Sequence, residues 1–392
     1  MNKIKQDNLL EIVLFILAFA TIFALREYIG GKNVSLFYCI AFVLVMGYNY
    51  INKIKKPIIC NVYIVALSTG FLAHVLMGFC SFSRVGDDLL ARLLPIMIMS
   101  ILLYKKSCCR IFQLFFFAFY IIECGISIYE KLSMVHLIDY SDVEDLQATS
   151  FEMNDSIEFR SFSLMLHPLY NANTISICLA FIFFQNINFK LKILLVVLGL
   201  LSLWAFNSRG AIMVWIILLL YRLVFYRTKM IFVLFLSTIL YFVIPILVDY
   251  IVYTEMLGRL SNTEIFDGSS LTRLMAFDEF SNTNWDLNSI LFGGRLLCYH
   301  GTDVSLENGA LLDLGYWGIL IGTIKILGEI VVTFWSVQNY QLKQKVFIMI
   351  ATWGVAFMNN NSFSNWLISI FVFGLITFGN LNSKDNESLI SC

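Results

Sequence analysis

The residues best suited to chemistry are concentrated in one polar stretch, LFGGRLLCYHGTDVSLENGALLDLGYWG, which spans 291–318. It places Arg295, His300 and Glu307 close together between two strongly apolar segments. The planar, permanently charged fork of an arginine suits phosphate oxygens, whereas an imidazole or a carboxylate can accept a proton. This combination indicates a site that binds an anion and moves a proton.

A second candidate is Arg209, in FNSRGAIMVW, where a short turn is followed at once by a new apolar helix. Ser208 can cap that helix, whose first N–H groups then point outward. An arginine beside a helix N-terminus is electrostatically unfavourable unless an anion lies between them. We therefore expect Arg209 to bind phosphate; the alternative is simple contact with lipid headgroups.

The elements that position these residues are expected to be membrane-spanning helices. Apolar residues make up 59% of the sequence and charged residues 14%, which leaves too little polar surface for a soluble globule. A helix needs about 20 mainly apolar residues to cross the bilayer. About twelve segments meet this requirement: 9–25, 34–51, 61–80, 89–104, 111–128, 168–186, 191–206, 211–226, 231–252, 309–335, 345–358 and 364–380. We expect an all-α, polytopic integral membrane protein with a single transmembrane domain over 1–392, in which 309–335 is long enough to tilt or break.

Basic residues fall on every second connection between these segments. They are Lys3 and Lys5; Lys53, Lys55 and Lys56; Lys105, Lys106 and Arg110; Lys190 and Lys192; Arg222, Arg227 and Lys229; Lys343 and Lys345. Because cytoplasmic loops are enriched in Lys and Arg, these connections and both termini are predicted to be cytoplasmic. The outer face then carries two long loops, 129–167 and 253–308, in which we expect short helices.

Several arginines are predicted to lie on this outer face, where basic residues are disfavoured. They are Arg160, Arg209, Arg259, Arg273 and Arg295. Each one alone could pair with an acid or a headgroup, but together they favour a cationic site. His300 and Glu307 are the candidates for proton transfer, although Glu307 also suits the first turn of a helix without any catalytic role.

Other polar residues lie within the predicted spans. Asp313 follows Glu307 by two turns and is expected to line a cavity, while Lys325 and Glu329, spaced i and i+4, are expected to pair. His74 is expected to be a packing residue. The histidines and cysteines are too scattered to predict a metal site or a disulfide framework, so we expect neither a metal nor a cofactor.

Four segments, taken in order, resemble motifs of the O-antigen polymerase and O-antigen ligase family. This family consists of polytopic glycosyltransferases that act on lipid-linked oligosaccharides at the outer face of the bacterial inner membrane. The segments are RSFSLMLHPLYNANTISI from Arg160, NSRGA at 207–211, SSLTRLMAFDEF followed by Trp285 and LFGG, and ENGALLDLGYWG at 307–318. There are two departures from the family pattern: Ser163 or its neighbours stand where glycine is expected, and the gap from Glu307 to Gly315 is short.

The resemblance implies an inverting, metal-independent polymerisation of lipid-linked repeat units. A hydroxyl of one glycan attacks the anomeric carbon of another, which leaves its polyprenyl diphosphate carrier. The enzyme then has to stabilise charge on the diphosphate and orient the acceptor. The implied partners are polyprenyl-diphosphate-linked oligosaccharides, membrane lipids and a chain-length regulator, with no role for nucleic acid.

The resemblance also implies roles for individual residues. Arg209 and Arg273 would bind the diphosphate with help from Arg295 or Arg160, Glu307 or His300 would take the acceptor proton, and His167, Asn308 and Asp313 would position the substrate. Two alternatives stay open. One is a ligase that transfers glycan to a lipid core, and the other is a transporter or flippase for the same lipids. Transporters tend to show internal repeats, and we find none in this sequence.

Overall fold

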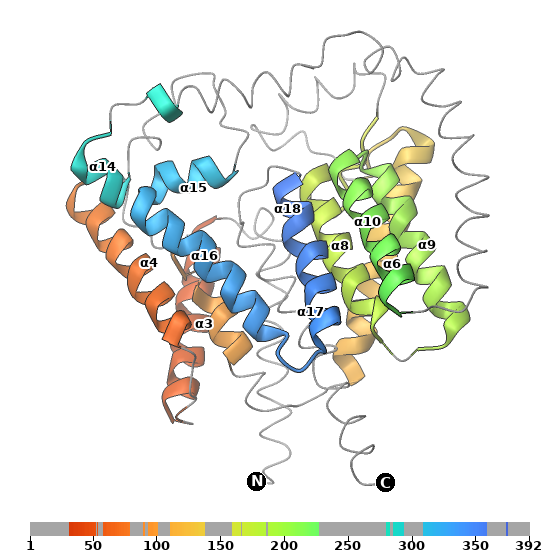
Figure 1. The fold of residues 1–392 in the computed structure, drawn as a ribbon, viewed down its shortest axis with the longest axis horizontal. Helices are drawn as coiled ribbons and strands as arrows, with labels where there is room; N and C mark the ends of the chain where they lie inside the picture. Colours follow the sequence, from red (N-terminus) through yellow and green to blue (C-terminus); the bar gives the residue numbers. More distant parts are fainter. Residues whose placement is uncertain are drawn as a thin grey trace.

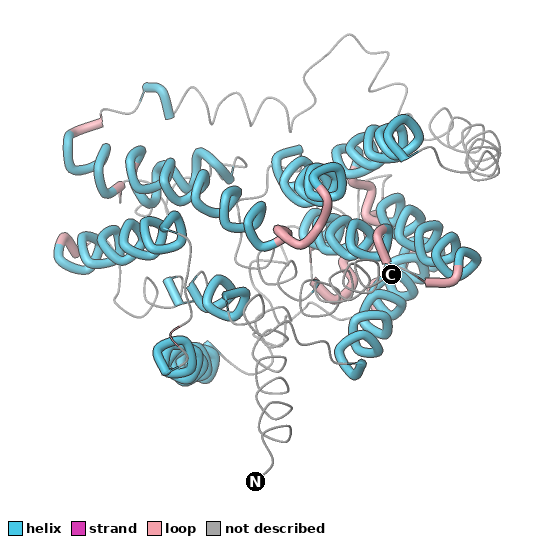
Figure 2. The backbone as a smooth tube through the Cα atoms, turned by 60° about the horizontal axis from the view of Figure 1, so that its bottom comes forward, coloured by secondary structure: helices cyan, strands magenta, loops and turns pink. Residues whose placement is uncertain are grey.

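The computed structural model describes residues 31–51, 53, 58–78, 89–90, 93–100, 110–137, 159–165, 167–185, 187–226, 280–282, 285–293, 309–358 and 374. Every regular element in these residues is a helix, so the all-α prediction is confirmed for this part of the chain; no strand is drawn there in Figure 2. The predicted spans 9–25 and 231–252, and nearly all of 364–380, lie outside the described residues. The helices form two groups, which lie side by side in Figure 1.

The first group is built around a broken helical hairpin. Its members are α3 (Gly31–Ile51), α4 (Ile58–Leu76), α14 (Leu287–Phe292), α15 (Gly309–Trp317) and α16 (Ile319–Ser336). The predicted span 309–335 is interrupted at Gly318, whose φ of +84° ends α15 and starts α16 in a new direction. Small residues then permit close helix packing, because a Cβ added at Gly328 would lie 2.6 Å from the ring of Tyr63 on α4.

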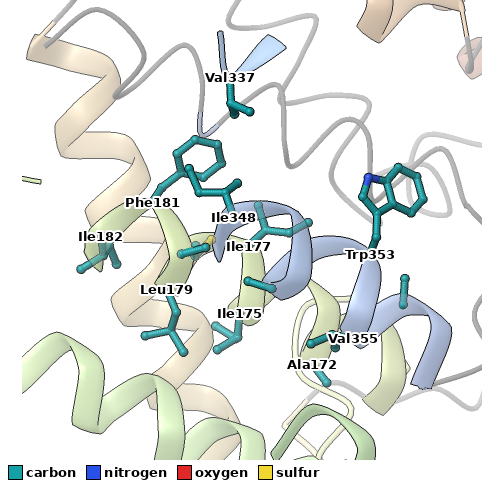
Figure 3. Close-up of a cluster of buried hydrophobic side chains, with 14 of the residues drawn as sticks. Ala172, Ile175, Ile177, Leu179, Phe181, Ile182, Val337, Ile348, Trp353 and Val355 are labelled. Carbon is teal, nitrogen blue, oxygen red and sulfur yellow. The ribbon is translucent and has the colours of Figure 1, made fainter. Parts of the chain in front are cut away.

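The second group surrounds one largely buried helix. Its members are α6 (Arg110–Ser133), α8 (Pro168–Phe183), α9 (Phe189–Ala205), α10 (Arg209–Tyr226), α17 (Leu342–Met349), the π-helical turn η1 (Ile350–Gly354) and α18 (Val355–Met358). Every residue of α8 from Asn171 to Phe183 is buried, and Figure 3 shows its apolar side chains against those of α17, η1 and α18. The indole of Trp215 on α10 donates to the Ser176 hydroxyl on α8 at 3.0 Å, which satisfies both buried polar groups.

The outer surfaces of the helices are strongly apolar. Large hydrophobic side chains are exposed along one face of α6 (Leu114, Phe115, Ile121, Ile122), of α10 (Met213, Ile216, Ile217, Leu220) and of α16 (Leu320, Leu327, Val331, Phe334). Within the described residues, Ile319–Ser336 is the one helix that length and composition qualify to cross a membrane. The expected count of about twelve spans therefore stays a prediction.

The two ends of the second helix group are joined by different contacts. At one end, the turn between α8 and α9 and the start of α17 carry basic residues, and Tyr221 at the end of α10 donates to the Lys343 carbonyl oxygen at 3.3 Å. At the other end, the backbone N–H of Ser161 donates to the Ala205 carbonyl oxygen at 3.1 Å. This second contact joins the segment before α8 to the turn between α9 and α10. In Figure 1 this end and the helices α14 and α15 of the first group lie on the same, upper side.

Candidate functional site

The candidate site lies where α6 ends, α8 begins and α9 turns into α10. Of the residues predicted from the sequence, the structure describes Arg160, His167 and Asp313 fully, and Arg209 by its backbone. Those outside the described residues are Arg273, Arg295, His300, Glu307 and Asn308, so their positions remain predictions.

The segment before α8 is held by a buried carboxylate on α6. Oε2 of Glu130 accepts hydrogen bonds from the Ser161 hydroxyl at 2.6 Å and from the N–H groups of Phe162 and Ser163 at 2.9 and 3.1 Å. Its Oε1 accepts the N–H of Leu137 at 2.9 Å. Bonds from several donors to one ionised acceptor are stronger than neutral ones. Glu130 therefore fixes the backbone on both sides of Ser161, directly beside Arg160.

The charge state of Glu130 agrees with this arrangement. Burial by itself raises the pKa of a carboxyl group. The His136 ring, whose Nδ1 lies 3.7 Å from Oε2, and the hydrogen bonds from Ser161, Ser163 and Leu137 outweigh burial and hold the pKa of Glu130 below its ordinary value. The ring of His136 is stacked 4.3 Å from that of Phe162. Glu130 is thus an ionised carboxylate whose hydrogen bonds hold the segment before α8 in place.

Ser163 adopts a backbone conformation that glycine normally occupies. Its φ is +40°, in the left-handed region that costs an L-residue energy. The Glu130 carboxylate accepts the backbone N–H of Ser163, and the Ser163 hydroxyl donates to the Glu123 carbonyl oxygen at 3.4 Å. Those contacts explain how serine is accepted where the resemblance leads one to expect glycine.

Asn171 and Lys131 tie the same segment from two further sides. The Asn171 amide accepts the N–H of Met165 at 3.0 Å and donates to the carbonyl of Phe162. The buried Lys131 ammonium donates to the Phe159 carbonyl oxygen at 2.5 Å and lies 5.6 Å from the centre of the Trp204 ring. Because Trp204 is near the end of α9, Lys131 connects this segment to the following turn.

The turn after α9 brings Arg209 to the same end of the helix group as Arg160. Asn207 has a φ of +52°, which reverses the chain, and the Ser208 hydroxyl accepts the N–H of Ala211 at 3.4 Å. The predicted N-cap at Ser208 is therefore confirmed, and α10 begins with Arg209. Its opening N–H groups carry the positive end of the helix dipole.

His167 caps the start of α8 and is neutral at ordinary pH. Its Nδ1 accepts the N–H of Leu169 at 3.3 Å, and Pro168 occupies the first helical position, where proline is favoured. Burial lowers the pKa of His167 to about 4, and the positive charge of Arg160 acts in the same direction. With Nδ1 occupied as an acceptor, the proton of the neutral ring is on Nε2, which suits a donor to a substrate oxygen better than a general base.

Asp313 lies in the other helix group and is already paired. The Lys325 ammonium donates to its carboxylate and lies 3.5 Å from Oε1 of Glu329, which also accepts the Tyr63 hydroxyl at 2.9 Å. The predicted Lys325–Glu329 pair is therefore present, with Asp313 added to it. All of these side chains are buried, so the structure places Asp313 in a helix-packing network.

The last two sequence segments of the resemblance meet through their glycines. Gly293, in LFGG, has a φ of +71°, and a Cβ there would lie 2.4 Å from the backbone nitrogen of Gly318, at the end of ENGALLDLGYWG. Nε2 of His74 lies 2.6 Å from the Phe292 carbonyl oxygen, and its ring is stacked 5.4 Å from that of Trp317. His74 is thus a packing residue of this junction.

Sequence reasoning missed the residues that hold the site. Glu130 and Lys131 follow the predicted span 111–128, and their partners lie about 30 residues further along the chain. The signal that could have found Glu130 is a lone acid in a helix end facing a Ser-x-Ser segment. No family model matches this sequence, and no curated protein or solved structure is significantly similar to it.

Proposed function

We propose that this chain polymerises polyprenyl-diphosphate-linked oligosaccharide repeat units at the outer face of a bacterial inner membrane, as an O-antigen polymerase or capsule polymerase does. The observation that supports this most is the junction of two separate sequence segments. The segment with Arg160 and His167 is hydrogen-bonded to the turn that leads into Arg209. Two arginines and a helix N-terminus at one end of a helix group are suited to an anion with many oxygen atoms.

The membrane location rests on the apolar surface together with the distribution of charge. Exposed aliphatic and aromatic side chains on α6, α10 and α16 would be costly in water, whereas a bilayer accommodates them. Basic residues at one end of the second helix group fit a cytoplasmic side. In this proposal about twelve spans cross the membrane, both termini are cytoplasmic and the site faces outward.

The proposed reaction needs the enzyme to stabilise charge and needs no covalent bond to the enzyme. A hydroxyl of the acceptor glycan forms a bond to the anomeric carbon of the donor, the bond from that carbon to the diphosphate oxygen breaks, and polyprenyl diphosphate leaves. Arg160 and Arg209, with Arg273 or Arg295, would bind the developing negative charge. Glu307 or His300 would take the hydroxyl proton.

His167 would act as a positioning residue in this mechanism. Its low pKa keeps the ring neutral, and its Nδ1 is engaged in capping α8. The ring can therefore offer an Nε2–H to a glycan or phosphate oxygen without adding a charge. Asn308, which comes before Gly309 in the sequence, would have a related positioning role.

The test is chain extension in cells that depend on this protein. Arg160→Gln and Arg209→Gln are each expected to reduce long surface glycan at normal protein levels, while Lys53→Gln, an exposed cation outside the site, leaves it unchanged. Loss of a polymerase leaves single repeat units on the lipid core, whereas loss of a ligase leaves the core bare and long chains on the carrier lipid. Normal glycan length in both arginine variants would refute the proposal.

A further inference from the structure

The opposite end of the second helix group carries cations that the proposed function does not use. They form the basic end cluster, which consists of Lys190, Lys192, Arg222, Lys343 and Lys345. The segments that carry them, 184–192, 221–226 and 337–345, contain no Asp or Glu. The positive charge of this end therefore comes from three separate connections.

Two of these cations converge on one oxygen atom. Nη1 of Arg222 and Nζ of Lys192 each donate to the Phe183 carbonyl oxygen, both at 3.4 Å. This oxygen is at the C-terminal end of α8, where the negative end of the helix dipole favours cations. An anionic headgroup beside the two cations would reduce the repulsion between their like charges.

The cations are held on a rigid aromatic base. The Arg222 guanidinium lies 4.5 Å from the centre of the Phe183 ring, a favourable cation–π distance. Phe347 of α17 lies against Phe183, with ring centres 5.5 Å apart, and Tyr221 bonds to the Lys343 carbonyl. Contacts around Arg222 thus join α8, α10 and α17 at this end of the group.

Exposed apolar side chains flank the cluster on the same elements. Phe189 and Leu191, which alternate with Lys190 and Lys192, are 51% and 45% exposed, and Leu342 beside Lys343 is 67% exposed. Charge beside exposed hydrocarbon matches a molecule that has both a phosphate and acyl chains. A free phosphate would use only the first of these features.

We propose that the basic end cluster binds the headgroup phosphate of an anionic phospholipid of the cytoplasmic leaflet. Basic pockets between membrane helices are suited to such headgroups. The inference rests on the membrane location in the proposed function and is independent of the glycan chemistry.

The test measures lipid binding by native mass spectrometry of the purified full chain in detergent. Phosphatidylglycerol and phosphatidylcholine with identical acyl chains are titrated, and we expect the wild-type protein to prefer phosphatidylglycerol. Removing two charges in Lys192→Gln/Arg222→Gln is expected to weaken phosphatidylglycerol binding about 25-fold, about fivefold for each charge. Binding of phosphatidylcholine stays constant, and the matched control Lys53→Gln leaves both affinities unchanged.

Several results would overturn the inference. They are equal binding of the two lipids by the wild-type protein, an unchanged preference in the double variant, and displacement of the lipid by millimolar inorganic phosphate. If the double variant does not fold, the salt dependence of the wild-type protein is tested instead. Raising NaCl from 0.05 to 0.5 M shortens the screening length about threefold and must reduce the preference for phosphatidylglycerol. A salt-independent preference contradicts the proposal.

Glycan chain extension is measured separately, so that either proposal can be refuted without the other. A wild-type protein that extends glycans but shows no lipid preference refutes the basic end cluster alone. One that prefers the anionic lipid but extends no glycan refutes the proposed function alone.

Discussion

Replacing Glu130 with glutamine should release the segment that carries Arg160. The change keeps the side-chain shape but turns three bonds to an ionised oxygen, from Ser161, Phe162 and Ser163, into neutral ones. Each such change costs about 1 kcal/mol. The new NH₂ group also faces the N–H of Leu137, so this part-buried donor loses its acceptor at a further cost of about 1 kcal/mol. We therefore expect a local destabilisation of about 4 kcal/mol.

Amide hydrogen exchange of the purified protein, followed by mass spectrometry, measures this effect directly. A loss of about 4 kcal/mol corresponds to nearly a thousandfold faster exchange, expected in the peptide that covers 159–165. The matched control is Glu123→Gln, about two turns earlier on the same helix α6. Its carboxylate accepts one weaker bond, from the N–H of Leu164 at 3.3 Å, so exchange there should rise about tenfold or less. Unchanged protection of 159–165 in Glu130→Gln would refute the anchoring role.

Three further predictions concern other parts of the molecule. Because the folded state holds the pKa of His167 near 4 and the unfolded chain titrates near 6.5, unfolding binds a proton in this window. The free energy of unfolding should then fall by up to about 3 kcal/mol as pH drops from 6.5 to 4. Thermal unfolding measured against pH should show this loss, and His167→Asn, which keeps a capping side chain, should flatten the pH dependence. Gly318→Ala should lower the yield of folded protein in detergent, since a Cβ would lie 2.7 Å from backbone atoms at a φ of +84°, whereas Gly47→Ala, with nothing within 4 Å, should be tolerated. Lys325→Met should cost about 3–5 kcal/mol by leaving buried carboxylates without their cation, and adding Asp313→Asn should recover part of the loss; an equal or lower thermal midpoint in the double variant would contradict the ion pairing.

The sequence was informative where a pattern is local. The helical class and the Ser208 cap follow from hydropathy and capping chemistry within a few residues, and the length of 309–335 indicated that this segment tilts or breaks. The pairing of Lys325 with Glu329 follows from helical spacing. In each case the partners lie within one turn or one hairpin of each other.

The contacts that assemble the candidate site were not predictable in this way. Glu130 reaches a segment about 30 residues further on, and Tyr63 reaches Glu329 across 266 positions. Such pairs depend on how whole helices pack, which one sequence does not reveal. The expectation that Asp313 lines a cavity stays a prediction; the structure adds the pairing of its carboxylate with Lys325, which the sequence analysis did not anticipate.

The most direct test of the central claim uses purified protein in vesicles supplied with polyprenyl-diphosphate-linked repeat units. The account predicts growth of glycan chains with release of one polyprenyl diphosphate per added unit. Because removing one donor to a developing charge typically costs about 10² to 10³ in rate, Arg160→Gln and Arg209→Gln should each slow growth at least about hundredfold, and Lys53→Gln should not slow it. A folded wild-type protein that releases no polyprenyl diphosphate, or arginine variants that extend chains at the wild-type rate, would contradict it.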